Sequence, residues 1–337
     1  MSKKYKDIAV LYGSDSSEWE VSVRSGEFTA SQIEGYNVYE ILAIKGRWEL
    51  VAFRKDGAAR VSIPEKVRPQ IDKSNFSVSM RDSVVKFDYV FIMQHGAPGE
   101  TGQIQGYFEM LGIPYSSTDS HTSAIVFDKF TAKCCLRALD PVKMADDALV
   151  SKGDDIEVFC KATVARLGLP LFVKPTDGGS SFGVTKVTKA EELPGAIEFA
   201  FSESNTAIVE KFISGRELTC AAWSDGWTVR ALPIIEIVSQ NEYFDYDAKY
   251  NGFSSEICPA PVPDKVAAEV QETTVRIFRK FGCKGIVRMD YILSSDGLYF
   301  LEINTIPGMT SASLVPKMVR TAGMEMPAFL SSIIEGA

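Results

Sequence analysis

Residues 285–314 read GIVRMDYILSSDGLYFLEINTIPGMTSASL, two short apolar segments joined by the small and polar residues SSDG. Such a joint between two apolar runs is typical of a β-hairpin. Side chains alternate between the two faces of a strand, so Arg288 and Asp290 share one face of the first strand. Glu302 and Asn304 share one face of the second. The sequence therefore predicts four polar side chains on a hairpin that is otherwise apolar.

The pairing of the two strands places these polar residues opposite each other. With residue 296 as the centre of the loop, Asp290 faces Glu302, and Arg288 faces Asn304. Like charges that face each other across a sheet are destabilising, so cations between the two carboxylates would explain the pair. Oxygen ligands of this kind suit magnesium. We therefore interpret this polar face, with the carboxylates of Asp290 and Glu302, as a metal and phosphate site.

The alternative is a solvated hairpin whose polar residues simply face water, which is the common situation for an arbitrary pair of acidic residues. Two features favour a binding site instead. The charges lie within the apolar runs DYIL and YFLEIN, and a Pro307-Gly308 turn with a small polar tail follows at once.

Composition describes an ordinary globular chain. With 337 residues, 45% of them hydrophobic, it is long enough for two or three domains that each have a core. Lys and Arg number 36 and Asp and Glu 44, a net charge of −8, which favours neither nucleic acid nor an anionic membrane as a partner. No apolar stretch approaches the roughly 20 residues that span a bilayer, and residues 1–13 lack a secretory pattern, so we expect a cytoplasmic protein.

Cysteine and histidine exclude several kinds of chemistry. The six cysteines are dispersed without CxxC spacing, which argues against a zinc site or a disulfide framework and favours reduced thiols. His95 and His121 are the only histidines, so chemistry that needs several histidines is excluded.

Periodicity in the first third of the chain predicts a βαβ unit. We expect a strand over residues 8–12, a helix over 22–35 and a strand over 38–44. A third apolar strand, 88–93, ends just before His95, and a helix over 102–111 follows it. Ligands of open parallel sheets bind beyond the carboxyl ends of the strands, so the loops that carry Glu18 and His95 should open on the same side.

A turn cluster, residues 116–120, marks a domain boundary near residue 117 and precedes a helix expected over 122–139. Further strands are expected over 171–174, 184–187 and 207–212, with a glycine-rich loop over 176–183. Residues 239–258 form a long loop rich in aromatic residues, and loops of this length inside compact domains are usually functional lids.

Two stretches favour a nucleotide. Lys174 precedes a loop of glycines, serine hydroxyls and backbone amides that can cradle phosphates, although a ligand-free glycine turn is a common alternative and the Walker spacing is absent. Residues 210–213, EKFI, stand at a strand end, which offers backbone groups and an apolar side chain to a purine. A surface ion pair between Glu210 and Lys211 is the simpler alternative. Glu217 is a candidate acceptor for ribose hydroxyls.

Taken together, the chain resembles the D-alanine–D-alanine ligases, members of the ATP-grasp superfamily, over nearly its whole length. The segments that carry the resemblance are SSEWEVSVRSG, HGAPGETGQIQG, VKPTDGGSSFGV, VEKFISGRE, FDYDAKY and LEINTIPGMTSASLVP, in the family's order. The resemblance implies an α/β (α+β) chain with the three-domain ATP-grasp fold. An N-terminal open-sheet domain, 1–117, would precede a central domain, 118–208, and a C-terminal domain, 209–337, which enclose the nucleotide between them.

The resemblance also implies a reaction. ATP would drive the joining of two D-alanine molecules through an acylphosphate, for peptidoglycan precursor synthesis. Two Mg²⁺ ions, replaceable by Mn²⁺, would be held by Asp290, Glu302 and Asn304, and a homodimer is expected. Arg288 and the backbone amide of Gly308 would stabilise the oxyanion of the tetrahedral intermediate.

Further roles follow residue by residue from the same resemblance. The ATP contacts would be Lys129, Lys174, Ser181, Glu210, Lys211, Phe212, Ile213, Glu217 and Lys249. Glu18 would hold the ammonium of the first D-alanine, and His95 would line that subsite. Ser313 and Leu314 would receive the carboxylate of the second. Glu18, Ser180 and Tyr250 would form a hydrogen-bonded set that joins loop, glycine loop and lid, although Tyr250 as a mere packing residue is an open alternative.

Three other functions are weighed against this one. A ligase that makes D-alanyl-D-lactate usually lacks the lid tyrosine, so Tyr250 argues against it. A dinucleotide-dependent oxidoreductase would need GxGxxG near the first turn, where residues 13–18 offer a single glycine. A nucleotide-binding protein without catalysis would not need the hairpin set of Arg288, Asp290, Glu302 and Asn304.

Overall fold

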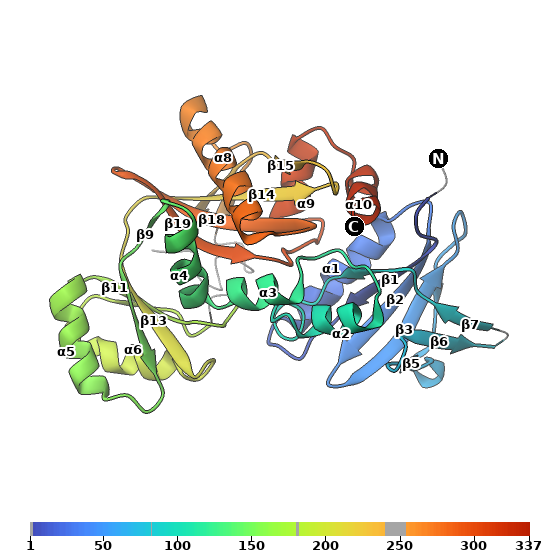
Figure 1. Ribbon diagram of the computed structural model, residues 1–337, viewed down its shortest axis with the longest axis horizontal. Helices are drawn as coiled ribbons and strands as arrows, with labels where there is room; N and C mark the ends of the chain where they lie inside the picture. The colour runs from blue at the N-terminus through green and yellow to red at the C-terminus, as the bar shows by residue number, and fades with distance from the viewer. Residues whose placement is uncertain (1–2, 82, 180–181, 240–253) are drawn as a thin grey trace.

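The computed structural model describes residues 3–81, 83–179, 182–239 and 254–337. Three groups of elements follow one another along the long axis of the molecule (Figure 1). The N-terminal sheet lies at one end, the sheet that contains β11 and β13 at the other, and the sheet that contains β14, β18 and β19 between them.

The N-terminal sheet has the strand order β4-β3-β2-β1-β8. Its strands are β1 (Asp7–Tyr12), β2 (Asn37–Ile44), β3 (Arg47–Arg54), β4 (Val61–Ser62) and β8 (Tyr89–Ile92). β1 runs parallel to β2 and to β8, and α1 (Trp19–Gln32) connects β1 to β2, so the predicted βαβ unit is confirmed. β1 supplies an unbroken run of buried side chains from residue 8 to residue 12, as expected for a central parallel strand.

The sequence-based prediction missed the antiparallel strands between residues 44 and 88. β3 and β4 extend the sheet in the antiparallel sense, and β5 (Ile71–Asp72), β6 (Ser77–Met80) and β7 (Ser83–Lys86) form a small separate sheet. The β2–β3 turn consists of Lys45 and Gly46, with φ values of 47° and 77°. Two left-handed residues are what the tightest hairpin turns require, but Lys at the first position is not a residue that signals such a turn.

The helix predicted over residues 122–139 is two helices, and the prediction was wrong on this point. α3 (Ser120–Phe127) ends at Asp128, and α4 (Lys129–Leu139) starts directly after it. The Asp128 carboxylate accepts a hydrogen bond from the backbone N–H of Thr131 at 2.6 Å and so caps α4. Asp119 caps α3 in the same way through Thr122. The break places Lys129 in the first turn of α4.

The next sheet has the order β10-β13-β11-β12. Its elements are β10 (Asp147–Ser151), β11 (Leu171–Pro175), β12 (Thr185–Val187) and β13 (Thr206–Lys211), with helices α5 (Ile156–Leu167) and α6 (Leu193–Ala200). Apolar residues of these helices and strands form one core, in which Val173, Ile197 and Val209 are fully buried. α5 and α6 lie along one side of the sheet (Figure 1), which leaves the other side for the site.

The largest sheet has the order β17-β16-β14-β18-β19-β9, with β15 paired to β14. Its strands are β9 (Lys143–Met144), β14 (Arg216–Ser224), β15 (Val229–Ala231), β16 (Ile235–Ser239), β17 (Ser254–Ile257), β18 (Ile286–Ser294) and β19 (Gly297–Asn304). The end of the segment predicted as a long loop is therefore strand β17, and residues 240–253 lie outside the described residues. α8 (Asp264–Phe281) packs against β14 and β15.

The remaining elements close the molecule. They are α2 (Gln103–Leu111), α9 (Leu314–Thr321), α10 (Met326–Glu335) and the short 3-10 helices at Glu65–Val67 and Ala190–Glu192. α10 packs against α1 and β14, and the chain end lies beside the N-terminal segment, where the Tyr5 hydroxyl donates a hydrogen bond to the Ala337 carbonyl at 3.2 Å. In the described part of the chain, no helix has the length and apolar character needed to cross a membrane.

The domain boundaries expected at residues 117 and 208 stay predictions. Two facts of the topology bear on them. β9, at residues 143–144, pairs with β19 in the large sheet, and β13 runs through residue 208 within the four-stranded sheet.

Candidate active site

The hairpin β18–β19 has the predicted pairing at its polar residues. Asp290 is opposite Glu302, and Arg288 is opposite Asn304. The assumed loop centre was wrong, because Ser294 pairs with Gly297 and the turn is centred half a residue earlier. A β-bulge next to Asp290 compensates, since Leu301 has no partner and shifts the register by one residue. The bulge therefore brings the two carboxylates opposite each other.

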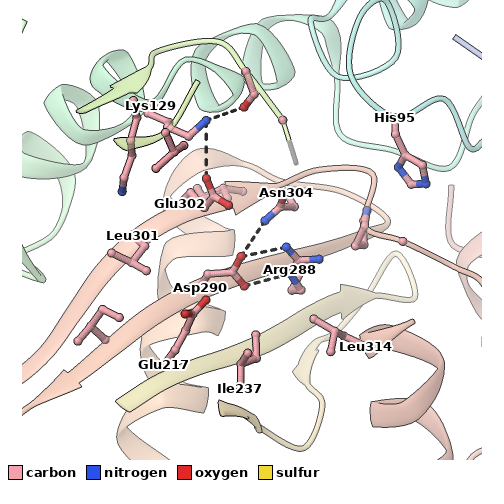
Figure 2. A pocket seen from close by; sticks show the side chains of 18 of the residues that line it. His95, Lys129, Glu217, Ile237, Arg288, Asp290, Leu301, Glu302, Asn304 and Leu314 are labelled. Carbon is pink, nitrogen blue, oxygen red and sulfur yellow. Dashed lines mark hydrogen bonds and ion pairs between the residues drawn. The ribbon is translucent and has the colours of Figure 1, made fainter. Parts of the chain in front are cut away.

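Asp290 lies at the centre of the polar group (Figure 2). Arg288 donates two hydrogen bonds to its carboxylate, from Nε at 3.0 Å and from Nη2 at 2.9 Å. Asn304 donates from Nδ2 at 3.2 Å, and the Thr219 hydroxyl donates at 2.5 Å from the neighbouring strand β14. The carboxylate is buried, so this full set of donors offsets the cost of removing its charge from water.

Glu302 faces a cation from another part of the chain. Lys129 Nζ lies 3.7 Å from Glu302 Oε2, and it donates a hydrogen bond at 2.7 Å to the backbone carbonyl of Gly178 in the glycine-rich loop. Figure 2 shows this lysine reaching from above toward the hairpin. One ammonium thus connects α4, the glycine-rich loop and β19.

Glu210 and Lys174 belong to a buried charged cluster. Glu210 accepts from Lys174 at 2.6 Å and from Lys133 at 2.5 Å, and Lys133 also lies 2.7 Å from Asp147. Burial disfavours the Glu210 carboxylate, yet the charges of both lysines outweigh it and lower the pKa of Glu210 to about 2. The alternative of a surface ion pair between Glu210 and Lys211 was wrong, because Glu210 is buried and its partners lie on β11 and α4.

Lys133 was missed by the sequence analysis. It is 1% exposed, four residues after Lys129 and therefore one turn further along nearly the same face of the helix. The signal available was the second lysine in the segment DKFTAK. A lysine that is buried to this extent requires partners, and the two carboxylates of Glu210 and Asp147 supply them.

An aromatic surface stands beside this cluster. The rings of Phe172 and Phe212 lie 5.8 Å apart, and Lys186 Nζ lies 4.5 Å from the Phe212 ring centre. Phe172 alternates with Lys174 on β11 and was not singled out from the sequence, although Phe212 was. Two aromatic rings, one on β11 and one directly after β13, form a surface of the kind on which a flat heterocycle packs.

The site is one large cavity of about 950 Å³ between the three groups of elements. Every predicted site residue within the described ranges lines it: Glu18, His95, Lys129, Lys174, Glu210, Lys211, Phe212, Ile213, Glu217, Arg288, Asp290, Glu302, Asn304, Gly308, Ser313 and Leu314. Ser180, Ser181, Lys249 and Tyr250 lie outside the described residues. The cavity is large enough for a nucleotide and small substrates together.

The loop that carries Glu18 meets the loop that carries His95, as predicted from the parallel strands β1 and β8. The Ser16 hydroxyl donates to the His95 carbonyl at 2.9 Å, and the Asp15 N–H donates to the Ala97 carbonyl at 3.3 Å. The Glu18 carboxylate also lies against the glycine-rich loop, because a Cβ atom at Gly179 would stand 2.2 Å from Glu18 Oε2. The loops of the first and second sheets therefore meet at this carboxylate.

His95 is buried, and both its ring nitrogens are hydrogen-bonded. Nδ1 lies 2.8 Å from the Ile306 carbonyl and Nε2 lies 3.0 Å from the Ser25 hydroxyl. A carbonyl can only accept, so Nδ1 carries the proton and the neutral ring accepts from Ser25 through Nε2. Burial lowers the pKa of His95 and so favours the neutral form. His95 lines the cavity as predicted, but its polar atoms are directed at protein groups.

Glu100 is a second buried residue that the sequence analysis did not single out. Its carboxylate accepts hydrogen bonds from the backbone N–H of Gly96 at 2.9 Å and of Ile306 at 3.2 Å. Burial, with the nearby charge of Glu18, raises the pKa of Glu100 to about 7. It stands within the quoted segment HGAPGETGQIQG, where an acid five residues after a histidine gave no distinct signal.

The turn after β19 leads to the start of α9. Ser313 is the N-cap residue of α9, and its hydroxyl accepts a hydrogen bond from the Thr310 N–H at 3.0 Å. Leu314 begins the helix, where backbone N–H groups have no partner within the helix. Anions are favoured at such a position, which suits the predicted role of Ser313 and Leu314.

The hairpin also fits a magnesium site. In the described ranges, no cluster of three or more His, Cys, Asp or Glu side chains is placed to hold a metal ion, so Asn304 would supply the third ligand beside Asp290 and Glu302. All three side chains offer hard oxygen atoms, the donors that magnesium prefers. Arg288 forms an ion pair with Asp290, and Lys129 forms one with Glu302. Positive charge is therefore favoured beside both carboxylates.

Comparisons with known proteins identify the family of the chain. Residues 7–118 match the family model of the D-ala D-ala ligase N-terminus, and residues 142–335 match that of the D-ala D-ala ligase C-terminus. The D-alanine–D-alanine ligase of Phocaeicola vulgatus is 41% identical over 333 residues, which cover 98% of both chains. That of Parabacteroides distasonis is 40% identical and covers 98% of this chain and 97% of its own.

Solved structures show the same fold. The VanG D-Ala:D-Ser ligase from Enterococcus faecalis superposes with a TM-score of 0.85 at 30% identity and covers 99% of both chains. The D-alanine–D-alanine ligase from Bacillus anthracis complexed with ATP superposes with a TM-score of 0.74 at 28% identity, covering 98% of this chain and 96% of its own. The chain therefore belongs to the D-alanine–D-alanine ligase family of ATP-dependent ligases and has their three-domain ATP-grasp fold.

Proposed function

We propose that the protein uses ATP to join two D-alanine molecules, with the residues of the described cavity in specific roles. The carboxylate of the first D-alanine attacks the γ-phosphorus of ATP, ADP leaves, and an acylphosphate forms. The amine of the second D-alanine then attacks the acyl carbon, inorganic phosphate leaves, and the amine loses a proton. The observation that supports this proposal most strongly is the β18–β19 hairpin, whose residues Arg288, Asp290, Glu302 and Asn304 all line one cavity.

The nucleotide would lie between the four-stranded sheet and the hairpin. Lys129 and Lys174 stand on that side of the cavity, and their ammonium groups suit contacts with phosphate oxygens. The ring pair Phe172 and Phe212 would pack against the adenine. Glu217, on β14 and beside the same space, would accept from the ribose hydroxyls.

Two Mg²⁺ ions, replaceable by Mn²⁺, would be held by Asp290, Glu302 and Asn304. Bound there, they would neutralise the charge that phosphoryl transfer concentrates between nucleotide and acceptor. The protein's own contribution is the fixed spacing of the two carboxylates, which the strand pairing of β18 and β19 sets. Thr219 and Arg288 orient the Asp290 carboxylate before any cation binds.

The oxyanion of the tetrahedral intermediate would be stabilised by two fixed donors, Arg288 and the backbone N–H of Gly308. Both line the cavity beside the hairpin. Glu18 would bind the ammonium of the first D-alanine, and Ser313 with Leu314 the carboxylate of the second. Ser180 and Tyr250 would complete the hydrogen-bonded set with Glu18, and Ser181 and Lys249 would add contacts to ATP.

The second substrate is the finer part of the proposal. Tyr250 favours an amino acid over D-lactate there, because the lid tyrosine is the residue that D-lactate ligases usually lack. The likeness to a D-Ala:D-Ser ligase makes D-serine the competitor to include in an assay. We further propose a homodimer in the cytoplasm, and domain boundaries at residues 117 and 208.

A single assay tests the reaction. Phosphate release from ATP in the presence of Mg²⁺ is measured with four substrates: D-alanine, L-alanine, D-alanine with D-serine, and D-alanine with D-lactate. The products are identified by mass spectrometry. We expect phosphate and D-alanyl-D-alanine from D-alanine alone, and no turnover with L-alanine. A strict requirement for D-lactate or D-serine, or ATP binding without turnover on any of these substrates, would contradict the proposal.

A further inference from the structure

Three side chains from the N-terminal part of the chain hold the turn that follows β19. Glu100 accepts from the Ile306 N–H at 3.2 Å, His95 bonds the Ile306 carbonyl at 2.8 Å, and the Ser25 hydroxyl accepts from the Met309 N–H at 3.3 Å. All three side chains are buried. Ile306 and Met309 are themselves almost fully buried. The turn between them contains Pro307 and Gly308.

These contacts form one chain of hydrogen bonds with a fixed direction. The Met309 N–H donates to Ser25, the Ser25 hydroxyl donates to Nε2 of His95, and Nδ1–H of His95 donates to the Ile306 carbonyl. Each acceptor is itself a donor to the next group, except the carbonyl at the end. Reversing any one link would leave a buried donor or acceptor without a partner, which costs about 1–3 kcal/mol.

Glu100 connects the same turn to the His95 loop. Its two carboxylate oxygens accept from the backbone N–H groups of Gly96, next to His95, and of Ile306, in the turn after β19. Both donors are backbone groups, so the carboxylate fixes two stretches of main chain relative to each other. The ionised form makes both hydrogen bonds best, since protonation converts one of the two oxygens into a hydroxyl, which is a weaker acceptor and a donor in its own right.

We propose that Ser25, His95 and Glu100 act as positioning residues that set the place of the Gly308 N–H, and we call them the turn clamp. The inference rests on the proposed function of Gly308 as an oxyanion donor. The turn clamp fixes the backbone on both sides of the Pro307-Gly308 pair, at Ile306 and at Met309. It thereby places one oxyanion donor from outside the hairpin that carries the other, Arg288.

Such positioning affects the rate more than the binding of ATP. A donor shifted by about 1 Å from the oxyanion costs on the order of 100-fold in rate, comparable with the loss of one donor. The turn clamp comes from the N-terminal group of elements, whereas the proposed ATP contacts Lys174 and Phe212 belong to the group at the other end of the molecule (Figure 1). Loosening it should therefore lower kcat and leave the KM for ATP unchanged.

The main test is Glu100→Gln, which keeps the size of the side chain and replaces one acceptor by a donor. We expect kcat to fall by about 10- to 100-fold with an unchanged KM for ATP. Ser25→Ala removes a different link of the turn clamp, and we expect the same split between kcat and KM. If Glu100→Gln fails to fold, Ser25→Ala alone tests the turn clamp. Glu109→Gln is the matched control, because Glu109 likewise binds the backbone N–H of Ser120 but lies away from the cavity.

The dependence of kcat on pH distinguishes a positioning role of Glu100 from a role in stability alone. The charged groups that act on Glu100 are Glu18, from the loop before α1, and Arg288 of β18, while His95 on the same loop is neutral. The pKa of Glu100 is raised to about 7 mainly by burial. The Gln side chain resembles the protonated acid. The ratio of wild-type to Glu100→Gln kcat should therefore shrink as the pH falls from about 8 to about 6, where the wild type becomes protonated.

The outcomes are distinct. Wild-type kcat in Glu100→Gln or in Ser25→Ala would overturn the turn clamp, as would a kcat ratio that is independent of pH. An equal loss of kcat in Glu109→Gln would also overturn it, because the effect would then be one of general stability. Failure of the proposed function looks different, since the wild type itself would release no phosphate with D-alanine.

Discussion

At the scale of single residues, Glu302 and Asp290 differ in what surrounds them. Asp290 is buried among Arg288, Asn304 and Thr219, whereas Glu302 is partly exposed and faces Lys129 at 3.7 Å. Glu302 is therefore the ligand that can be changed with less risk to the fold. Its carboxylate faces Lys129, and Lys129 keeps its hydrogen bond to the Gly178 carbonyl when the Glu302 charge is removed.

Glu302→Gln should lower Mg²⁺-dependent turnover by at least about 100-fold while the protein stays folded, because the change removes a ligand charge without changing volume. Turnover is measured over a Mg²⁺ titration, and folding by circular dichroism. Asp296→Asn is the matched control, since Asp296 lies at the turn of the same hairpin and contacts Tyr299 at 2.7 Å. Near-normal turnover in Glu302→Gln would count heavily against the metal assignment.

Gly179 offers a second test at a single residue. An added Cβ would stand 2.2 Å from Glu18 Oε2, and the backbone of Gly179 lies outside the left-handed region, so alanine strains the side chain of Glu18 rather than the main chain. Gly179→Ala should raise the KM for D-alanine by about 10-fold or more, because Glu18 can no longer keep its place.

The stability of Gly179→Ala should stay close to that of the wild type in urea unfolding. Gly195→Ala is the control, because a Cβ at this helical glycine meets nothing within 4 Å. If Gly179→Ala keeps the wild-type KM for D-alanine, Glu18 does not bind the substrate where we place it.

At the scale of elements, the buried charges join α4 to the four-stranded sheet. Lys133 on α4 meets Glu210 on β13 and Asp147 on β10, and Lys174 on β11 meets Glu210 from the other side. These contacts hold α4 in the orientation that directs Lys129 at Glu302. The charges of the cluster therefore connect the stability of one element to the geometry of the site.

This cluster predicts a dependence of stability on pH. The pKa of Glu210 is about 2 in the folded protein and 4.5 in its ordinary state. The unfolded chain therefore binds the proton first, and stability is lost as the pH falls from about 4.5 toward 2, by about 3 kcal/mol at most. Urea unfolding at a series of pH values should show a smaller slope in Glu210→Gln than in the wild type. Equal slopes would show that Glu210 does not carry this charge effect.

Sequence reasoning succeeded for the elements with strong local signals. The βαβ unit around β1 and the β18–β19 hairpin follow from apolar periodicity and a turn of polar residues. The register at Asp290 was right although the loop centre was not, because no sequence pattern reveals that Leu301 forms a bulge. The break between α3 and α4 was missed, since Asp128 both ends one helical pattern and caps the next.

Residues whose role depends on distant parts of the chain could not be found from the sequence. Lys133 and Glu100 carry no motif of their own, and each is defined by partners more than 70 residues away, Glu210 for one and Ile306 for the other. The exposed or buried state of such residues is set by tertiary packing. The predicted residues that line the cavity were named for two reasons: the hairpin and the glycine-rich loop have local patterns, and the family resemblance fixes the others one by one.

At the scale of the whole molecule, the site exists only where three groups of elements meet. The N-terminal loops supply Glu18 and His95, the four-stranded sheet supplies Lys174, and the large sheet supplies the hairpin. Figure 1 shows the large sheet between the other two groups. The proposed reaction requires that this hairpin holds divalent ions against the phosphates of ATP.

A crystal structure with nucleotide and Mn²⁺, read by the anomalous signal of the metal, tests that claim most directly. We expect metal peaks in the cavity between the hairpin and the phosphates, each within about 2.3 Å of oxygen atoms from Asp290, Glu302 or Asn304. Metal bound to the phosphates alone, with these three side chains turned away from it, would contradict the account.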